Sequence, residues 1–128
     1  MKYVCLCYDE EKKLKAMSKS EWDAIVREVY AYNEELQKKG TLITSEALQS
    51  VQLSKTVRVR DGRVSTTDGP FAETKEQLGG FFLINAGDLD EAIQVASRLP
   101  GARLGCIEVR PTMELSQGMS FKNENVWL

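Results

Sequence analysis

The most specific stretch of the chain spans residues 67–84 and reads Thr67-Asp68-Gly69-Pro70-Phe71-Ala72-Glu73-Thr74-Lys75-Glu76-Gln77-Leu78-Gly79-Gly80-Phe81-Phe82-Leu83-Ile84. Its first part joins a turn-forming Asp-Gly-Pro triplet to a charged segment. Its second part opens with a glycine pair and continues into the most apolar run of the chain. That run predicts a β-strand over residues 80–84, and because both of its faces are apolar we expect it to lie inside a sheet.

A second central strand is predicted at residues 2–8. Side chains alternate along a strand, and here both sides are largely apolar, with Val4, Leu6 and Tyr8 on one and Tyr3, Cys5 and Cys7 on the other. Residues 9–17 are predicted to form a charged connection. Cys5 and Cys7 are interpreted as small core side chains, because a bridge between two residues on one face of a strand is sterically poor.

Two helices are predicted from their start signals. Ser18-Lys19-Ser20-Glu21 has the form of a capping box and opens a helix that runs to about Lys39, before Gly40. A cap-like start at Asp88 opens the second helix, which ends at Pro100. Apolar residues at helical spacing predict buried stripes, made of Trp22, Ile25, Val26, Val29, Tyr30 and Leu36 in the first helix and Leu89, Ala92, Ile93, Ala96 and Leu99 in the second.

The remaining strands are predicted at residues 41–48, at 56–60 with 63–67, and at 104–110. Asp61-Gly62 between two alternating segments is a strong hairpin signal and places Val59 beside Val64. With the hairpin set aside as an insertion, the order is β-α-β-β-α-β, the order of ferredoxin-like α+β domains. Two helices cover one face of such a sheet, so we expect a second copy of the chain to cover the other and form a homodimer.

Length and composition fit one soluble domain. The chain has 128 residues and a net charge near −2, with both signs interspersed, so neither nucleic acid nor membrane is expected as a partner. Three cysteines, an odd number, favour a reducing compartment, and a cytoplasmic location is expected. The chain contains no histidine, which removes the commonest general base and metal ligand. No metal and no cofactor are expected.

The segment Asp68-Gly69-Pro70-Phe71-Ala72-Glu73-Thr74-Lys75-Glu76, running into Gly79-Gly80-Phe81, resembles the signature of the YCII-related family, in particular its Asp-Gly-Pro-Phe (DGPF) branch. The resemblance spans residues 1–113, which we interpret as the domain, with residues 114–128 as a C-terminal tail. The apolar cluster of that tail, around Trp127, is interpreted either as an arm packed across the dimer or as a frayed end.

The resemblance implies a dimeric α/β-barrel built on a ferredoxin-like subunit. It also implies a protein of unassigned function, since members of this branch are mostly uncharacterised. Some resemble accessory modules that accompany sigma factors, which implies a sigma-factor-type partner. Others in the wider family are proposed enzymes that use a His–Asp dyad, in which Asp68 matches the aspartate but the histidine has no counterpart here.

The candidate site residues cluster around the turn at Asp68. Asp68 has two open roles, as an acceptor that caps its own turn or as a general base, and Glu73 is a second candidate base. Four further residues are predicted to bind ligand: Tyr32, Glu46, Phe71 and Arg110. Glu46 is expected to pair with Arg110 or a tyrosine if it points inward. The leading hypothesis is a module that binds a small organic ligand. The alternative is a lyase-like or proton-transfer enzyme that uses Asp68 or Glu73.

Overall fold

The computed structural model of the chain describes residues 1–115. Four strands form one sheet, two further strands form a separate ribbon, and four helices and one 3-10 turn connect them. In chain order the elements are β1 (Lys2–Asp9), α1 (Glu11–Lys15), α2 (Lys19–Lys38), β2 (Leu42–Ala47), η1 (Val51–Leu53), β3 (Lys55–Arg60), β4 (Arg63–Asp68), β5 (Gln77–Asn85), α3 (Leu89–Ser97), α4 (Gly101–Leu104) and β6 (Cys106–Pro111).

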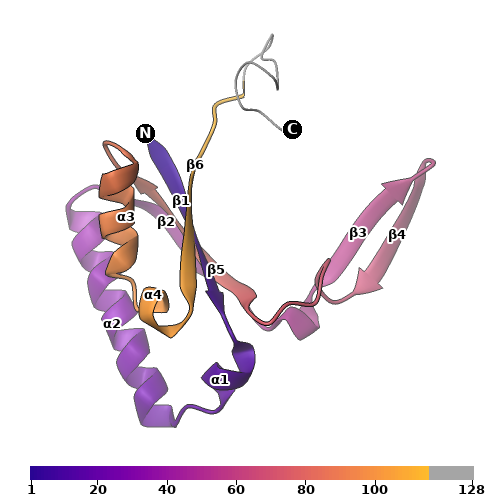
Figure 1. Ribbon diagram of the computed structural model, residues 1–128, viewed down its shortest axis with the longest axis horizontal. Helices are drawn as coiled ribbons and strands as arrows, with labels where there is room; N and C mark the ends of the chain where they lie inside the picture. The colour runs from indigo at the N-terminus through magenta and orange to yellow at the C-terminus, as the bar shows by residue number, and fades with distance from the viewer. Residues whose placement is uncertain (116–128) are drawn as a thin grey trace.

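The four-stranded sheet has the order β2-β5-β1-β6, and every neighbouring pair is antiparallel (Figure 1). The two central strands are therefore β1 and β5, the two strands whose sequences are apolar on both faces, as predicted. This α+β arrangement is compatible with the ferredoxin-like fold.

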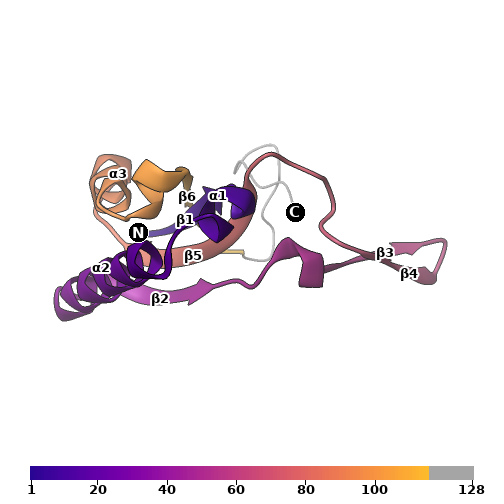
Figure 2. The same cartoon turned by 90° about the horizontal axis from the view of Figure 1, so that it is seen from below.

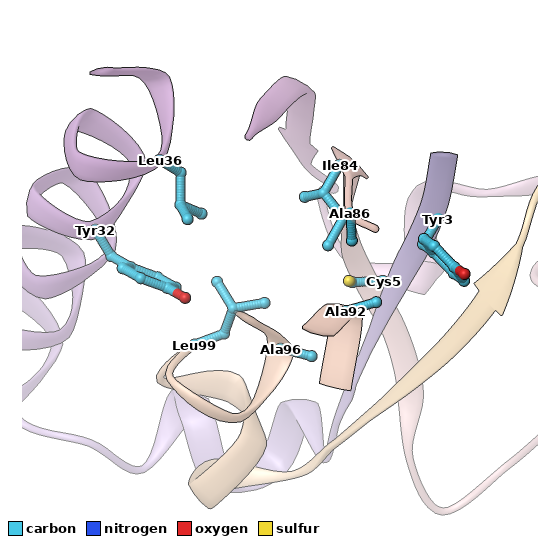
Figure 3. Packing of buried hydrophobic residues seen from close by; sticks show 9 residues of the cluster. All are labelled: Tyr3, Cys5, Tyr32, Leu36, Ile84, Ala86, Ala92, Ala96 and Leu99. Atoms are coloured by element: carbon cyan, nitrogen blue, oxygen red, sulfur yellow. The ribbon is translucent and has the colours of Figure 1, made fainter. Parts of the chain in front are cut away.

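The main helices α2 and α3 lie on the same side of the sheet (Figure 2). Between them and the sheet lies a compact core of nine buried residues (Figure 3). They come from both central strands, the loop that follows β5, both helices and the turn after α3, and α3 itself contributes two alanines, which let it approach the sheet closely. The core residues are Tyr3, Cys5, Tyr32, Leu36, Ile84, Ala86, Ala92, Ala96 and Leu99.

Helix α2 begins as its sequence predicts. Ser18 accepts a hydrogen bond from the Glu21 amide, and the Glu21 carboxylate accepts one from the Ser18 amide, which completes the capping box. Asp88 caps α3 in the same position by accepting from the Glu91 amide at 2.9 Å. Gly40 ends α2 with a positive φ of 72°, a conformation that favours glycine.

Three contacts attach α2, from its middle at Glu28 onward, to the elements beside it. The Tyr32 hydroxyl donates to the Val95 carbonyl of α3 at 2.7 Å. Arg98, at the end of α3, donates two hydrogen bonds to Glu35, at 2.6 and 3.1 Å. Arg103 of α4 binds both carboxylate oxygens of Glu28. Forked pairs of this kind fix orientation as well as distance.

The hairpin forms a ribbon of its own outside the sheet. Val59 lies opposite Val64 as predicted, and the turn residues Asp61 and Gly62 both have positive φ, at 52° and 73°. The ribbon projects away from the helices (Figure 1), and its three valines are exposed.

One face of the sheet has no helix over it within residues 1–115 (Figure 2). Directly paired residues share a face of a sheet, so the pairs Val4–Leu83 and Leu6–Phe81 lie on the side opposite the core. We call these four residues the open face. An apolar sheet face of this kind is typical of an interaction surface.

Two predictions about the helices were wrong. Residues 9–17 do not form a plain connection, because Glu11–Lys15 fold into α1. The stripe of α2 is also buried differently, since Trp22 and Tyr30 are 45% and 71% exposed while Tyr32 is buried. In the second predicted stripe, Leu89 and Ile93 are likewise exposed, whereas Ala92, Ala96 and Leu99 are buried as predicted.

All three cysteines are free, and Cys5 is a buried core side chain as interpreted from the sequence. Among residues 1–115, no helix is both long and apolar enough to cross a membrane. The predicted arm or frayed end of the C-terminal tail lies outside the described residues from residue 116 on. The cytoplasmic location stays a prediction.

Candidate functional site

A cavity of about 550 Å³ lies between the sheet and residues 22–33 of α2. The helix wall carries large apolar side chains, among them Trp22, Ile25, Val26 and Val29. Residues that follow α3 close one end, including Leu99, Pro100 and Leu104. The cavity therefore lies along the stripe that the sequence predicted to be buried.

On the sheet side, the cavity is lined mostly by small residues, with Phe82 as a larger one; the small residues are Cys7, Ser45, Ala47, Gly79 and Gly80. Gly80 cannot be enlarged, since a β-carbon at that position would lie 2.7 Å from the Glu46 carbonyl oxygen of the neighbouring strand. Strand pairing thus requires a residue that fills no space.

A β-bulge lies beside the cavity. Cys7 pairs with Gly80 and Tyr8 with Leu78, so Gly79 has no partner on β1. Bulges bend a strand and change the direction of neighbouring side chains, and they are common next to functional sites.

Asp9, the last residue of β1, lines the cavity at this bulge. Its carboxylate lies between two glycines, because β-carbons added at Gly79 and Gly105 would lie 3.3 and 3.0 Å from its two oxygens. Burial raises the pKa of Asp9 above its ordinary value, and the negative charge of Glu76 raises it further. In the described part of the chain, no ion pair or hydrogen bond holds this carboxylate.

Asn33 of α2 supplies a second unusual polar atom to the cavity. Its side-chain oxygen Oδ1 is buried, and no donor within residues 1–115 bonds to it. An unpaired buried polar group costs about 1–3 kcal/mol, so such atoms are rare and often mark a place where a ligand binds.

Cys7 also lines the cavity but is not an activated nucleophile. Burial, followed by the nearby acidic groups Cys5, Asp9 and Cys106, raises the pKa of its thiol to about 12. The nucleophilic form of cysteine is the thiolate, so Cys7 remains an apolar, protonated wall residue at neutral pH.

The three residues predicted around the Asp-Gly-Pro-Phe turn lie outside this cavity. Asp68 is exposed at the end of β4 and pairs with Lys55, directly opposite on β3. Its side chain does not cap the turn, since the Gly69 amide donates to the Ser54 carbonyl at 2.8 Å. Phe71 is 81% exposed, and Glu73 is exposed as well.

Of the other predicted ligand-binding residues, only Glu46 borders the cavity, from edge strand β2. Its side chain lies on the opposite side of the sheet, because Glu46 pairs with Phe81 of the open face. Tyr32 points its hydroxyl to Val95 and belongs to the core. The pair with Arg110 that was expected for an inward-pointing Glu46 does not form within the single chain, because the two residues lie on opposite edge strands. Arg110 donates to Glu108 on its own strand, at 2.8 Å.

Within residues 1–115, no cluster of three or more His, Cys, Asp or Glu side chains has an arrangement able to hold a metal ion.

A profile of the YCII-related domain matches residues 1–116. The chain belongs to the YCII-related family. A relative from Rhizobium meliloti (strain 1021), described as an uncharacterised protein, is 40% identical over 113 residues, which cover 87% of this chain and 91% of that protein. The family predicted from the central signature is thereby confirmed, whereas the DGPF branch and the sigma-factor-type partner stay predictions.

Sequence reasoning about this YCII-related chain missed Asp9 and Asn33. Asp9 had a visible signal, because it is a carboxylate directly after a strand predicted to be central. Asn33 had none, since it lies at the edge of a helical stripe and only the tertiary structure shows that its oxygen is buried without a partner.

Replacing Asp9 by Asn is expected to stabilise the protein at neutral pH. A carboxylate whose pKa is raised in the folded state lowers stability as pH rises from its unfolded pKa to its folded one, and this loss then persists at higher pH. We expect a gain of about 1 kcal/mol or less at pH 7, since solvent screens a partly exposed group, and no gain near pH 3. Urea unfolding at both pH values measures it.

The matched control is Glu10→Gln. Glu10 is the neighbouring carboxylate, and it already pairs with Lys13 and Lys75. This variant is expected to show no gain at pH 7. A loss of stability in Asp9→Asn at pH 7 would show that the Asp9 carboxylate has a stabilising partner in solution.

Proposed function

We propose that this YCII-related protein binds a small, largely apolar organic molecule in the cavity between α2 and the sheet. The observation that carries the proposal is the cavity itself, with its apolar helix wall and its small-residue floor. Its volume of about 550 Å³ falls within the range of ligand sites, about 300–1,000 Å³. Apolar walls with a few polar groups are also typical of such sites.

The partial exposure of Trp22 and Tyr30 supports this function. Both aromatic side chains border the cavity, yet the chain leaves much of their surface in contact with water. Covering apolar surface contributes about 25 cal/mol per Å². A bound apolar molecule would cover part of that surface. It would also fill the space that the small side chains of the sheet leave empty.

We further propose that the protein acts as a homodimer assembled through the open face, in the manner of a dimeric α/β-barrel. Val4, Leu6, Phe81 and Leu83 form an apolar centre that no helix covers within residues 1–115. A second copy offers the same apolar surface, and a two-fold interface pairs a patch with itself. Both sheets would then be buried on two faces, as the composition of β1 and β5 favours.

The test of ligand binding is a titration with N-phenylnaphthylamine, an uncharged dye that fluoresces in apolar sites. We expect saturable binding of one dye per chain. Val26→Phe places a larger side chain in the cavity wall and should weaken binding about tenfold or more, which corresponds to roughly 1.4 kcal/mol. Ala24→Phe, on an exposed position of the same helix, is the matched control and should bind normally.

Two results would contradict the proposal. One is dye binding that does not saturate, which is typical of nonspecific adsorption to exposed apolar surface. The other is equal weakening by Val26→Phe and Ala24→Phe, which would place the dye elsewhere or indicate a general effect on α2.

A further inference from the structure

Two polar groups at the cavity lack a partner from the chain. Asp9 carries negative charge, and the buried Asn33 Oδ1 is a hydrogen-bond acceptor to which no donor within residues 1–115 bonds. No lysine or arginine is among the lining residues of the described chain. The cavity thus presents acceptors and negative charge in an apolar surrounding, where electrostatic interactions are stronger than in water.

The two neighbouring carboxylates at the end of β1 differ in their partners. Glu10 binds both Lys13 and Lys75, at 3.9 and 3.4 Å. Asp9 has neither a lysine nor an arginine within ion-pair distance among residues 1–115, although Glu76 adds a second negative charge nearby. The nearby lysines therefore pair with Glu10, and Asp9, the carboxylate that borders the cavity, is left without a cation.

An unpaired carboxylate and an unpaired amide oxygen both gain from a ligand that donates hydrogen bonds. A carboxylate that remains charged gains most from a cation, because charge-assisted hydrogen bonds are about twice as strong as neutral ones. A ligand carboxylate would instead meet like charge from Asp9 and would find no positive side chain among the lining residues.

We propose that the cavity selects ligands that have an apolar body and a cationic, hydrogen-bond-donating head such as a protonated amine, with the head beside Asp9, and that it disfavours carboxylates of the same shape. This inference rests on the proposed binding function and specifies its ligand class. It also assigns Asp9 as the specificity-determining residue, with Asn33 as an additional acceptor in the same cavity.

The test uses three probes with one naphthalene skeleton: naphthylmethylamine, naphthylmethanol and naphthoate. Each competes with N-phenylnaphthylamine at about pH 7.5, where the amine is protonated and the acid is ionised. We expect the amine to bind about tenfold tighter than the alcohol, a difference of roughly 1.4 kcal/mol, and the naphthoate to bind more weakly than the alcohol. Because the unmodified protein is used, the comparison does not depend on the folding of a variant.

Asp9→Asn should remove the preference for the amine over the alcohol. Glu10→Gln is the matched control and should retain the preference, since Glu10 is paired with two lysines and does not line the cavity. Equal affinities for the three probes, or tighter binding of naphthoate than of the amine, would overturn the inference while the binding function stands. If the dye binds and saturates but Asp9→Asn keeps the full amine preference, the assignment of Asp9 is wrong. If neither the dye nor the probes bind, both the proposed binding function and this inference fail.

Discussion

Gly105→Ala is expected to destabilise the protein by about 3 kcal/mol, the upper end of the cost of overpacking a tightly packed site. A β-carbon at residue 105 would lie 1.9 Å from the Tyr8 carbonyl oxygen and 3.0 Å from the Tyr8 carbonyl carbon. Both atoms belong to the backbone of central strand β1, so no side-chain rotation relieves the clash. Strand β6 begins at the next residue and pairs with Tyr8, and its start would have to move off the sheet. Urea unfolding at a fixed protein concentration measures the loss.

The matched control is Gly101→Ala, four residues earlier at the start of α4. A β-carbon there meets only Ile107 and Cys7 side-chain atoms, at 3.9 and 4.0 Å, which are ordinary contact distances. Alanine is favoured over glycine in helices by about 1 kcal/mol, so this variant should be as stable as the parent or slightly more stable. Unfolding of Gly105→Ala at the parent's urea concentration would show that β6 approaches β1 less closely than described.

Leu83→Lys is expected to convert the proposed homodimer into a monomer. Leu83 lies on the open face opposite Val4, in a central strand, so the lysine would stand near the middle of the interface. An uncompensated buried charge costs roughly 3–5 kcal/mol, which weakens association more than a hundredfold. Light scattering after size exclusion should then give the mass of one chain, 14.4 kDa, instead of twice that value.

Ile93→Lys separates this effect from a general one. Ile93 is an apolar residue on α3 that is 48% exposed, on the side of the sheet that the helices cover. We expect this variant to remain dimeric, and both variants should keep the circular dichroism of the parent. A parent protein that elutes as a single chain at high micromolar concentration would contradict assembly through the open face.

Local signals predicted most of the fold because their causes are local. The capping box at Ser18, the cap at Asp88 and the Asp61-Gly62 turn each depend on a few neighbouring residues, and the structure contains all three. The apolar character of β1 and β5 predicted their central positions for a related reason, since only strands buried on both faces gain from such composition.

The burial of α2 could not be predicted in the same way. Helical periodicity identifies an apolar stripe but does not show what lies opposite it. Here the stripe faces Gly79, Gly80 and other small residues of the sheet, so part of it borders a cavity instead of a core. Whether a large helix side chain faces a glycine of another element depends on how the two elements pack. Periodicity within a single sequence does not give that information.

The most conspicuous motif was also a poor guide to the cavity. Asp68 and Phe71 belong to a segment rich in turn residues, which made them the natural site candidates. The hairpin, however, places Asp68 beside Lys55 on an exposed ribbon. The glycine pair later in the stretch lines the cavity, with Gly79 beside the Asp9 carboxylate. Within one stretch of about eighteen residues, the most distinctive motif thus lies outside the cavity and the less distinctive glycine pair lies at it.

The attachment of α2 also bears on how a molecule would enter and leave. Tyr32 binds α3, Glu35 binds Arg98 just after α3, and Glu28 binds Arg103 of α4. Within the described chain, no ion pair or hydrogen bond joins residues 19–27 to another element. Polar contacts therefore hold α2 from Glu28 onward, and its first turns have no such contacts, so the helix can tilt about a point near Glu28. Exchange of a ligand should tilt the first two turns, around Trp22, and leave the second half in place.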